Sequence, residues 1–179
     1  MIDFKLIQHK HSFEGITKTF ESEFADFAPT EKFVSVEKYF GINVGVVGSA
    51  TKLAHDGLMA MANDFKGVYV FLEGTKPIYT GISRKVISRI HQHVKGKNHF
   101  SASLAFNIGK HKALIEGSDL SNAKRGDISY KEHICPAQKF LLTQNVAFHP
   151  MEDDISLYLF EVYCAMRLNT LFMNDFGTH

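Results

Sequence analysis

The chain of 179 residues has few cysteines and no long apolar run. Its two cysteines, Cys135 and Cys164, lie far apart in different settings, which predicts reduced thiols and argues against a disulfide or a zinc site. No apolar run approaches the roughly 18 residues that a membrane span needs. The N-terminal stretch MIDFKLIQHKHSFEG lacks the apolar segment and the cleavage-like site of a secretion signal. We therefore expect a cytoplasmic protein that makes no contact with a membrane.

Internal repeats, low-complexity tracts and Pro/Gly-rich linkers are missing as well, so composition alone does not divide the chain. Hydrophobic residues make up 45% of the sequence and charged residues 22%, which is enough apolar material for a core and excludes wholesale disorder. The length fits one domain of ordinary size with an elaborated N-terminal part.

Acidic residues are absent from one long stretch of an otherwise balanced chain. Between Thr75 and Ile115 the sequence has eight lysines and arginines and four histidines, but no aspartate or glutamate. Residues 1–63 carry eight acids against six bases, and residues 150–179 carry five acids against one base. A polyanion such as DNA would therefore find one basic face, at residues 75–115, on which to place its phosphates. The alternative is an ordinary solvated basic surface.

The apolar pattern predicts an α+β domain, with a helix-rich N-terminal block, a hairpin, a helix, and then a strand and a final helix. Helices are predicted over residues 13–27, 49–65, 84–94, 100–108 and 155–172. Extended segments are predicted over residues 1–9, 33–47, 68–72 and 78–81, and within 139–150, where Pro150 ends the strand. Ser83 and either Asp153 or Asp154 are the expected helix caps, and residues 109–130 predict an irregular loop.

Glu161 is the polar residue that does not fit its surroundings. The final helix is apolar nearly all round, so we expect it to be largely buried. A carboxylate there costs several kcal/mol unless it is paired or bound to a cation. The alternative is a position at the helix margin, where Glu161 reaches water or pairs with Arg167 or Lys131. Mg²⁺ is the metal that tolerates a single carboxylate, because it keeps most of its waters and also binds substrate phosphate.

Four further polar residues would complete a site with Glu161, provided that the fold brings residues 69–93 and 161 together. Tyr69 and Tyr79 lie in the two arms of the predicted hairpin, and Arg89 and His93 lie one turn apart in the next helix. A cation on Glu161, a guanidinium that grips phosphate oxygens and a phenol–imidazole pair that activates water are together sufficient for phosphodiester hydrolysis. The phenols need nearby cations, such as Arg89 and a metal, to lower their pKa. Taken singly, each residue is equally consistent with a strand aromatic or a solvated helix flank.

The ordered series resembles the GIY-YIG nuclease family over roughly residues 66–179. Its elements are Gly67-Val68-Tyr69, Tyr79-Thr80-Gly81, Arg89, His93 and a late Glu161. The resemblance implies a fold with a small three-stranded antiparallel sheet flanked by helices. It also implies that the protein is an endonuclease that cleaves DNA and requires Mg²⁺ or Mn²⁺. It leaves residues 1–65 as a helix-rich N-terminal extension packed on the nuclease domain.

The resemblance also implies roles for individual residues. Tyr69 and Tyr79 become the active-site phenols, Arg89 clamps the scissile phosphate, His93 assists proton transfer or positions Tyr69, and Glu161 is the sole protein ligand to the metal. Substrate binding is assigned to a second group of residues: Gly81, Ser83, Lys85, His99 and Asn174. Within that group, His99 matches a further family histidine, and Asn174 matches the closing asparagine one residue later than the commonest spacing.

Two other functions remain open at this point. The domain can be a nucleic-acid-binding module that keeps the basic face without turnover, or an interaction module that docks a protein partner through residues 1–65. Those first 65 residues contain no zinc finger, helix-turn-helix or RNP-like pattern that would specify a DNA target. Any sequence specificity therefore has to come from the extension or from residues 109–130.

Overall fold

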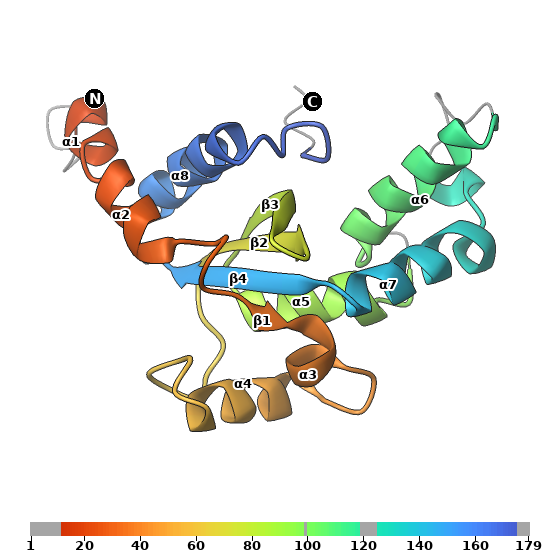
Figure 1. The fold of residues 1–179 in the computed structure, drawn as a ribbon, viewed down its shortest axis with the longest axis horizontal. Coiled ribbons are helices and arrows are strands. Elements are labelled where there is room, and N and C mark those ends of the chain that lie inside the picture. The colour runs from red at the N-terminus through yellow and green to blue at the C-terminus, as the bar shows by residue number, and fades with distance from the viewer. Residues whose placement is uncertain (1–11, 99, 119–124, 175–179) are drawn as a thin grey trace, which may run out of the picture.

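A computed structural model describes residues 12–98, 100–118 and 125–174, and its centre is an antiparallel sheet with the strand order β1-β4-β2-β3 (Figure 1). The strands are β1 (Val34–Ser35), β2 (Gly67–Glu73), β3 (Lys76–Ser83) and β4 (Asn145–Pro150). The α+β class is confirmed. The expected sheet of three strands is wrong, because β1 from the N-terminal part adds a fourth strand beside β4, with Val34 opposite Val146.

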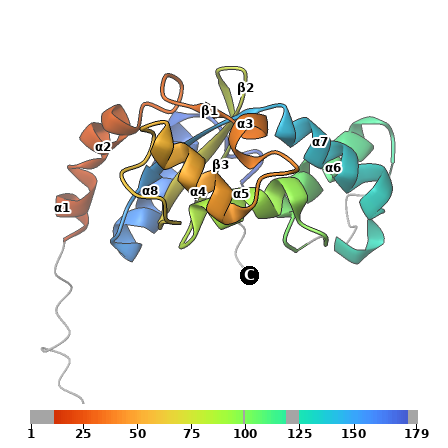
Figure 2. The same ribbon diagram turned by 90° about the horizontal axis from the view of Figure 1, so that it is seen from below.

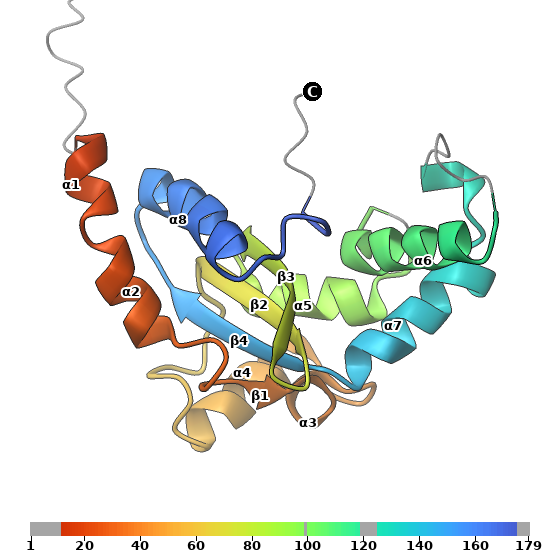
Figure 3. The same cartoon turned by 45° about the horizontal axis from the view of Figure 1, so that its top comes forward.

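Helices cover both faces of this sheet (Figures 2 and 3). They are α1 (Phe13–Thr17), α2 (Phe20–Phe27), α3 (Val36–Phe40), α4 (Val46–His55), α5 (Val86–Lys95), α6 (Ser103–Ile115), α7 (Cys135–Leu142) and α8 (Asp154–Arg167). A 3₁₀ turn at Arg125–Asp127 and a π-helical turn at Tyr130–Ile134 precede α7. No helix in the described ranges is long and apolar enough to cross a membrane.

Strand β2 is buried on both faces, and its alternation separates two cores. Tyr69 and Phe71 pack into one core with α3, α5, α6 and α7, whereas Val68 and Val70 pack into the other with α1, α2 and α8. The strand can lie this close to β4 because it begins with glycine. A Cβ added at Gly67 would sit 2.2 Å from the carbonyl oxygen of His149, so any side chain there would push the strands apart.

The segment 33–47 departs from its predicted extended conformation. Only Val34–Ser35 is strand, and α3 begins at the next residue. Ser35 caps α3 by accepting a hydrogen bond from the backbone N–H of Lys38 at 3.2 Å. Val36, Tyr39 and Phe40 then fall on the buried side of the helix. Their helical spacing, and not their β propensity, decides the local structure.

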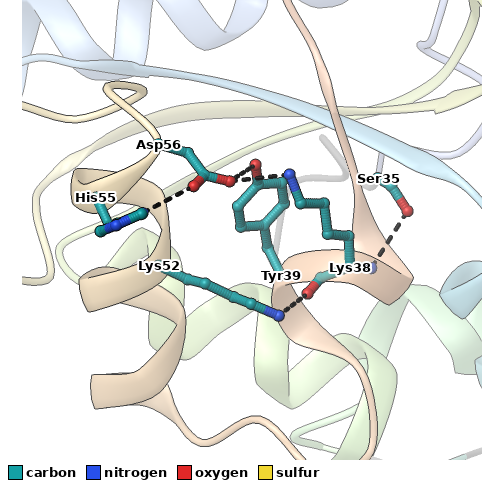
Figure 4. Close-up of polar contacts among 6 residues, drawn as sticks. All are labelled: Ser35, Lys38, Tyr39, Lys52, His55 and Asp56. Atoms are coloured by element: carbon teal, nitrogen blue, oxygen red, sulfur yellow. Dashed lines mark hydrogen bonds and ion pairs between the residues drawn. The ribbon is translucent and has the colours of Figure 1, made fainter.

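Helix α4 is also shorter than predicted, since it ends at His55 and is followed by Gly57 in the left-handed region at φ 72°. Asp56 at its end joins α4 to α3, accepting hydrogen bonds from Lys38 Nζ at 2.8 Å and Tyr39 Oη at 2.6 Å (Figure 4). Lys38, followed by Tyr39 and His55, holds the pKa of Asp56 well below its usual range. The interaction of the Asp56 carboxylate with Lys38 and Tyr39 is therefore present at neutral pH and is lost as the pH falls through the acidic range.

The C-terminal half of the structure differs from the predicted secondary structure and burial in three further places. Helix α6 extends to Ile115, and α7 occupies residues predicted to be loop or strand, so β4 starts only at Asn145. Asp153 is the cap of α8, accepting from the backbone N–H of Ser156 at 2.7 Å. Burial of α8 on all sides is wrong, because one stripe faces outward: Ile155, Tyr158, Val162 and Met166 are 41–65% exposed. The predicted strand at residues 1–9 lies outside the described residues.

Candidate active site

The two tyrosines of the hairpin lie on the same face of the sheet. Tyr69 pairs with Gly81 across the β2–β3 ladder, and Phe71 pairs with Tyr79, so Tyr69 and Tyr79 are diagonal neighbours with ring centroids 6.1 Å apart. Gly81 makes room for both rings. A Cβ built on Gly81 would lie 2.7 Å from Tyr69 Oη and 2.8 Å from Tyr79 Cε1. The glycine predicted to bind substrate thus has a clear structural role in seating the two phenols.

His93 contacts Tyr69 directly from α5. Its Nε2 lies 2.7 Å from Tyr69 Oη, and its Nδ1 accepts a hydrogen bond from the backbone N–H of Leu104 at 3.4 Å. Burial, together with the nearby charge of Arg89, lowers the pKa of His93 well below its usual value, so the ring is neutral. Because Nδ1 is an acceptor, the single ring proton resides on Nε2 and is donated to the Tyr69 oxygen. A solvated helix flank is therefore wrong for His93.

Arg89 supplies the positive charge of the site. Its guanidinium donates to Ser103 Oγ at 2.7 Å, to Gln92 Oε1 at 2.9 Å and to the carbonyl oxygen of Ser101 at 3.3 Å. The side chain is half-buried, and its charge influences the pKa of Tyr69, Tyr79 and His93. The N-terminal end of α6 therefore holds the guanidinium beside the two phenols and the imidazole.

Both phenols are neutral in this environment. Burial raises the pKa of Tyr69 well above its ordinary value and also raises that of Tyr79. Arg89 acts in the predicted direction by lowering both values, but burial outweighs it. The guanidinium alone is thus insufficient to make either tyrosine acidic.

Glu161 lies on α8, which packs against the edge strand β3. Burial raises the pKa of the Glu161 carboxyl to about 7, and the charge of Glu161 contributes to the raised pKa of Tyr79. Arg167, one candidate partner, pairs instead with Glu21 at 3.6 Å. Within the described ranges no ion pair involves Glu161. The structure therefore presents a half-buried carboxyl on a helix that packs against the strand of Tyr79.

Such a carboxyl fits one kind of metal site. The part of the chain that the structure describes has no cluster of three or more His, Cys, Asp or Glu side chains suited to a metal ion. Sites built from several protein ligands, such as structural zinc sites, are thus not supported by these residues. A single carboxylate suits Mg²⁺, which fills its remaining positions with water and phosphate oxygens.

Asn174 closes the outer edge of the sheet next to Tyr79. Its Nδ2 donates to the carbonyl oxygen of Thr80 at 2.6 Å, and its Oδ1 accepts from the Thr80 N–H at 3.4 Å. Thr170 reinforces this contact through its hydroxyl, which lies 2.9 Å from the Thr80 hydroxyl. The side chain of Asn174 thus has the contacts of a positioning residue that fixes the backbone of β3 beside the phenol.

The other residues assigned to substrate binding either precede α5 directly or fall outside the described residues. Ser83 Oγ accepts from the backbone N–H of Lys85 at 2.9 Å, and Lys85 is exposed. Ser83 is not the cap of α5. Asp64 caps it instead, accepting from the N–H groups of Ile87 at 2.8 Å and Ser88 at 3.0 Å. His99 is among the residues that are not described.

The basic stretch is less uniformly exposed than its composition suggests. His91 and His93 are buried, and Lys95 donates to backbone carbonyls in the loop before α4. Lys85 and Lys97 are exposed on the surface around α5. The positive surface charge of this stretch therefore comes from lysine and arginine, with little contribution from the histidines of α5.

No protein-family model, curated protein or solved structure matches this chain. Functional conclusions therefore depend on the residues and contacts described above. The firmest of these is the group formed by Tyr69, Tyr79, Arg89 and His93, with Glu161 on the helix that packs against the strand of Tyr79.

Proposed function

We propose that this protein is a divalent-metal-dependent DNA endonuclease of the GIY-YIG type, built on a nuclease core at residues 66–179. The observation that carries the proposal is the meeting of Tyr69, Tyr79 and His93 beside the Arg89 guanidinium, with the half-buried carboxyl of Glu161 on the helix that packs against the strand of Tyr79. Hydrolysis of a phosphodiester needs these elements, namely a cation that binds the phosphate, a metal ligand and a group that orients water.

Arg89 and Glu161 divide the work of stabilising charge. Arg89 offers N–H groups to the non-bridging oxygens of the scissile phosphate, exchanging some of its present contacts at Ser101 and Ser103 for them. Glu161 would hold Mg²⁺ or Mn²⁺ as its only protein ligand. When bound, the metal supplies Lewis-acid stabilisation of the phosphate and of the leaving oxygen.

Tyr79 is the better candidate of the two phenols to orient the attacking water. Tyr69 is fully buried and already accepts the Nε2–H of His93, so this pair is suited to positioning. Tyr79 is only half-buried, and its pKa is raised partly by the charge of Glu161. Neutralising that carboxylate removes one cause of the raised pKa and increases the fraction of Tyr79 present as phenolate, the form that can accept a proton.

A second candidate is a nucleic-acid-binding module without turnover. The exposed lysines around α5 support binding, but binding alone gives no reason to keep Glu161 half-buried without an ion-pair partner among the described residues. Endonuclease activity accounts for both features. Docking of a protein partner through residues 1–65 remains a prediction from the sequence.

Cleavage of supercoiled plasmid tests the proposal. We expect the wild-type protein to nick or cut DNA with Mg²⁺ or Mn²⁺, and Arg89→Ala to reduce the rate at least about a hundredfold, the usual cost of removing a charge-stabilising donor. Arg84→Ala is the matched control, because Arg84 is exposed and pairs weakly with Asp154 at 3.7 Å. A wild-type protein that cuts no DNA with either metal, or an Arg89→Ala protein with full activity, would overturn the proposal.

The pH dependence of cleavage gives a separate prediction. Because the pKa of Glu161 is about 7, at low metal concentration the rate should fall about tenfold per pH unit below neutrality, as the carboxyl takes up a proton in place of the metal. Higher metal concentrations should move the midpoint to lower pH. The measurement is the initial rate against pH at two Mg²⁺ concentrations, and a midpoint that does not respond to Mg²⁺ contradicts this role of Glu161.

A further inference from the structure

A groove opens between α6 and the segment that follows α8. We call it the α6 groove; Asn107, Lys110, His111, Phe172 and Asn174 line it. The two walls are joined by Asn107, whose Nδ2 donates to the carbonyl oxygen of Met173 at 3.4 Å. Figure 3 shows the segment after α8 lying beside α6. The groove thus lies between a helix, α6, on one side and a loop, the segment after α8, on the other.

The α6 groove begins at the candidate active site. Asn174, one of its lining residues, holds the backbone of Thr80 beside Tyr79. On the other wall, Ser103 in the first turn of α6 binds the Arg89 guanidinium. Residues at Ser103, Asn107 and Lys110 succeed one another at helical spacing, so one face of α6 runs from the phosphate clamp into the groove.

The length of this face matches a short piece of a nucleic-acid strand. Lys110 lies seven residues beyond Ser103, which is about 10 Å along the helix axis. This is about three nucleotide steps of 3.4 Å measured along a duplex. A strand whose scissile phosphate lies at Arg89 therefore brings the next few phosphates past Lys110 and His111.

The chemistry of the lining is that of a single-strand binding surface. Among the lining residues that the structure describes, Lys110 and His111 have basic side chains, Asn107 and Asn174 carry amides, Leu114 and Met173 are apolar, and none is acidic. Phe172 stands at its edge with 66% of its surface exposed. An exposed aromatic ring beside basic side chains is suited to stacking with an unpaired base while the cations follow the phosphates.

We propose that the α6 groove binds the unpaired nucleotides that flank the scissile phosphate, with Phe172 stacking on a base and Lys110 contacting the backbone. The inference rests on the proposed nuclease function for the position of the scissile phosphate. It assigns the substrate class as DNA that is single-stranded on one side of the cut, such as a flap, a splayed end or a locally opened duplex.

Binding is measured without turnover. Fluorescence anisotropy with Ca²⁺ in place of Mg²⁺ compares a labelled single strand of about 16 nucleotides, the upper end of typical site sizes, with the corresponding duplex. Phe172→Ala should weaken single-strand binding about tenfold and duplex binding much less. Lys110→Gln should weaken it severalfold and reduce the salt slope by about 0.7. Lys112→Gln is the matched control on the same helix, since Lys112 is exposed and does not line the groove.

The outcomes separate this inference from the proposed function. Single-strand affinity that is unchanged in Phe172→Ala overturns the groove, as does an equal loss for single strand and duplex or an absence of DNA binding by the wild type. Cleavage of a flapped substrate at the wild-type rate by Phe172→Ala also overturns the groove and leaves the nuclease intact. A wild type that binds single strands through Phe172 but cuts none supports the groove and contradicts the nuclease.

Discussion

Glu161→Gln is expected to abolish metal-dependent cleavage and to make the folded protein more stable at about pH 8. The glutamine keeps the shape of the side chain but removes the charge that burial opposes. The folded pKa of Glu161 is about 7, above its ordinary 4.5, so its contribution to stability is fully present below the lower value and is lost as the pH rises through the higher one. Since the side chain is only half-buried, the gain is on the order of 1 kcal/mol.

Thermal melts check this prediction. At about pH 8 the variant should melt about 2–4 °C above the wild type, and near pH 4 the difference should vanish. Mg²⁺ should raise the melting temperature of the wild type and leave that of Glu161→Gln unchanged. Glu31→Gln is the control, because Glu31 is exposed on the loop after α2. An identical pH response of all three proteins would show that Glu161 is solvated and would contradict its part in the site.

Gly81→Ala is expected to cost both activity and stability. The new methyl group would lie 2.7 Å from Tyr69 Oη and 2.8 Å from Tyr79 Cε1, too close for either ring to stay in place. Overpacking of this kind costs about 1–3 kcal/mol. Because both phenols must shift, cleavage should fall about a hundredfold or more, the typical effect of an ångström-scale displacement at a reacting centre.

The control for Gly81→Ala is Gly126→Ala, where an added Cβ meets nothing within 4 Å. Rates are measured well below the melting temperature of each variant, so that lost activity is not simply unfolding. If Gly81→Ala cleaves as fast as Gly126→Ala, the phenols are not in the reaction centre. A lower melting temperature with an unchanged rate would show that this glycine serves only the fold.

Local patterns were sufficient to predict the elements that carry the candidate site. Continuous apolar residues marked β2, the Gly-containing turn marked the hairpin, and helical spacing marked α5 and α8. Tyr69 and Tyr79 share a face because of the hairpin register, and Arg89 and His93 follow within one helix. Hairpin register and helical spacing are set by residues that are close in the sequence, so both can be predicted from a single sequence.

Long-range contacts could not be predicted in the same way. Asp64 caps α5 from more than twenty residues upstream, and β1 joins the sheet only through pairing with β4. The tautomer of His93 depends on the amide of Leu104, and the orientation of Arg89 depends on Ser103. Periodicity also overstated the burial of α8, because an apolar helix at the edge of a small domain has neighbours on one side only.

Plasmid cleavage by the wild type and Glu161→Gln, each with Mg²⁺ and with excess chelator, tests the central claim most directly. The wild type should cut only with the metal, and the variant should cut in neither condition although it folds at least as stably. Cleavage by Glu161→Gln at the wild-type rate, or cleavage by the wild type in excess chelator, would contradict a reaction that depends on a metal held by this carboxylate.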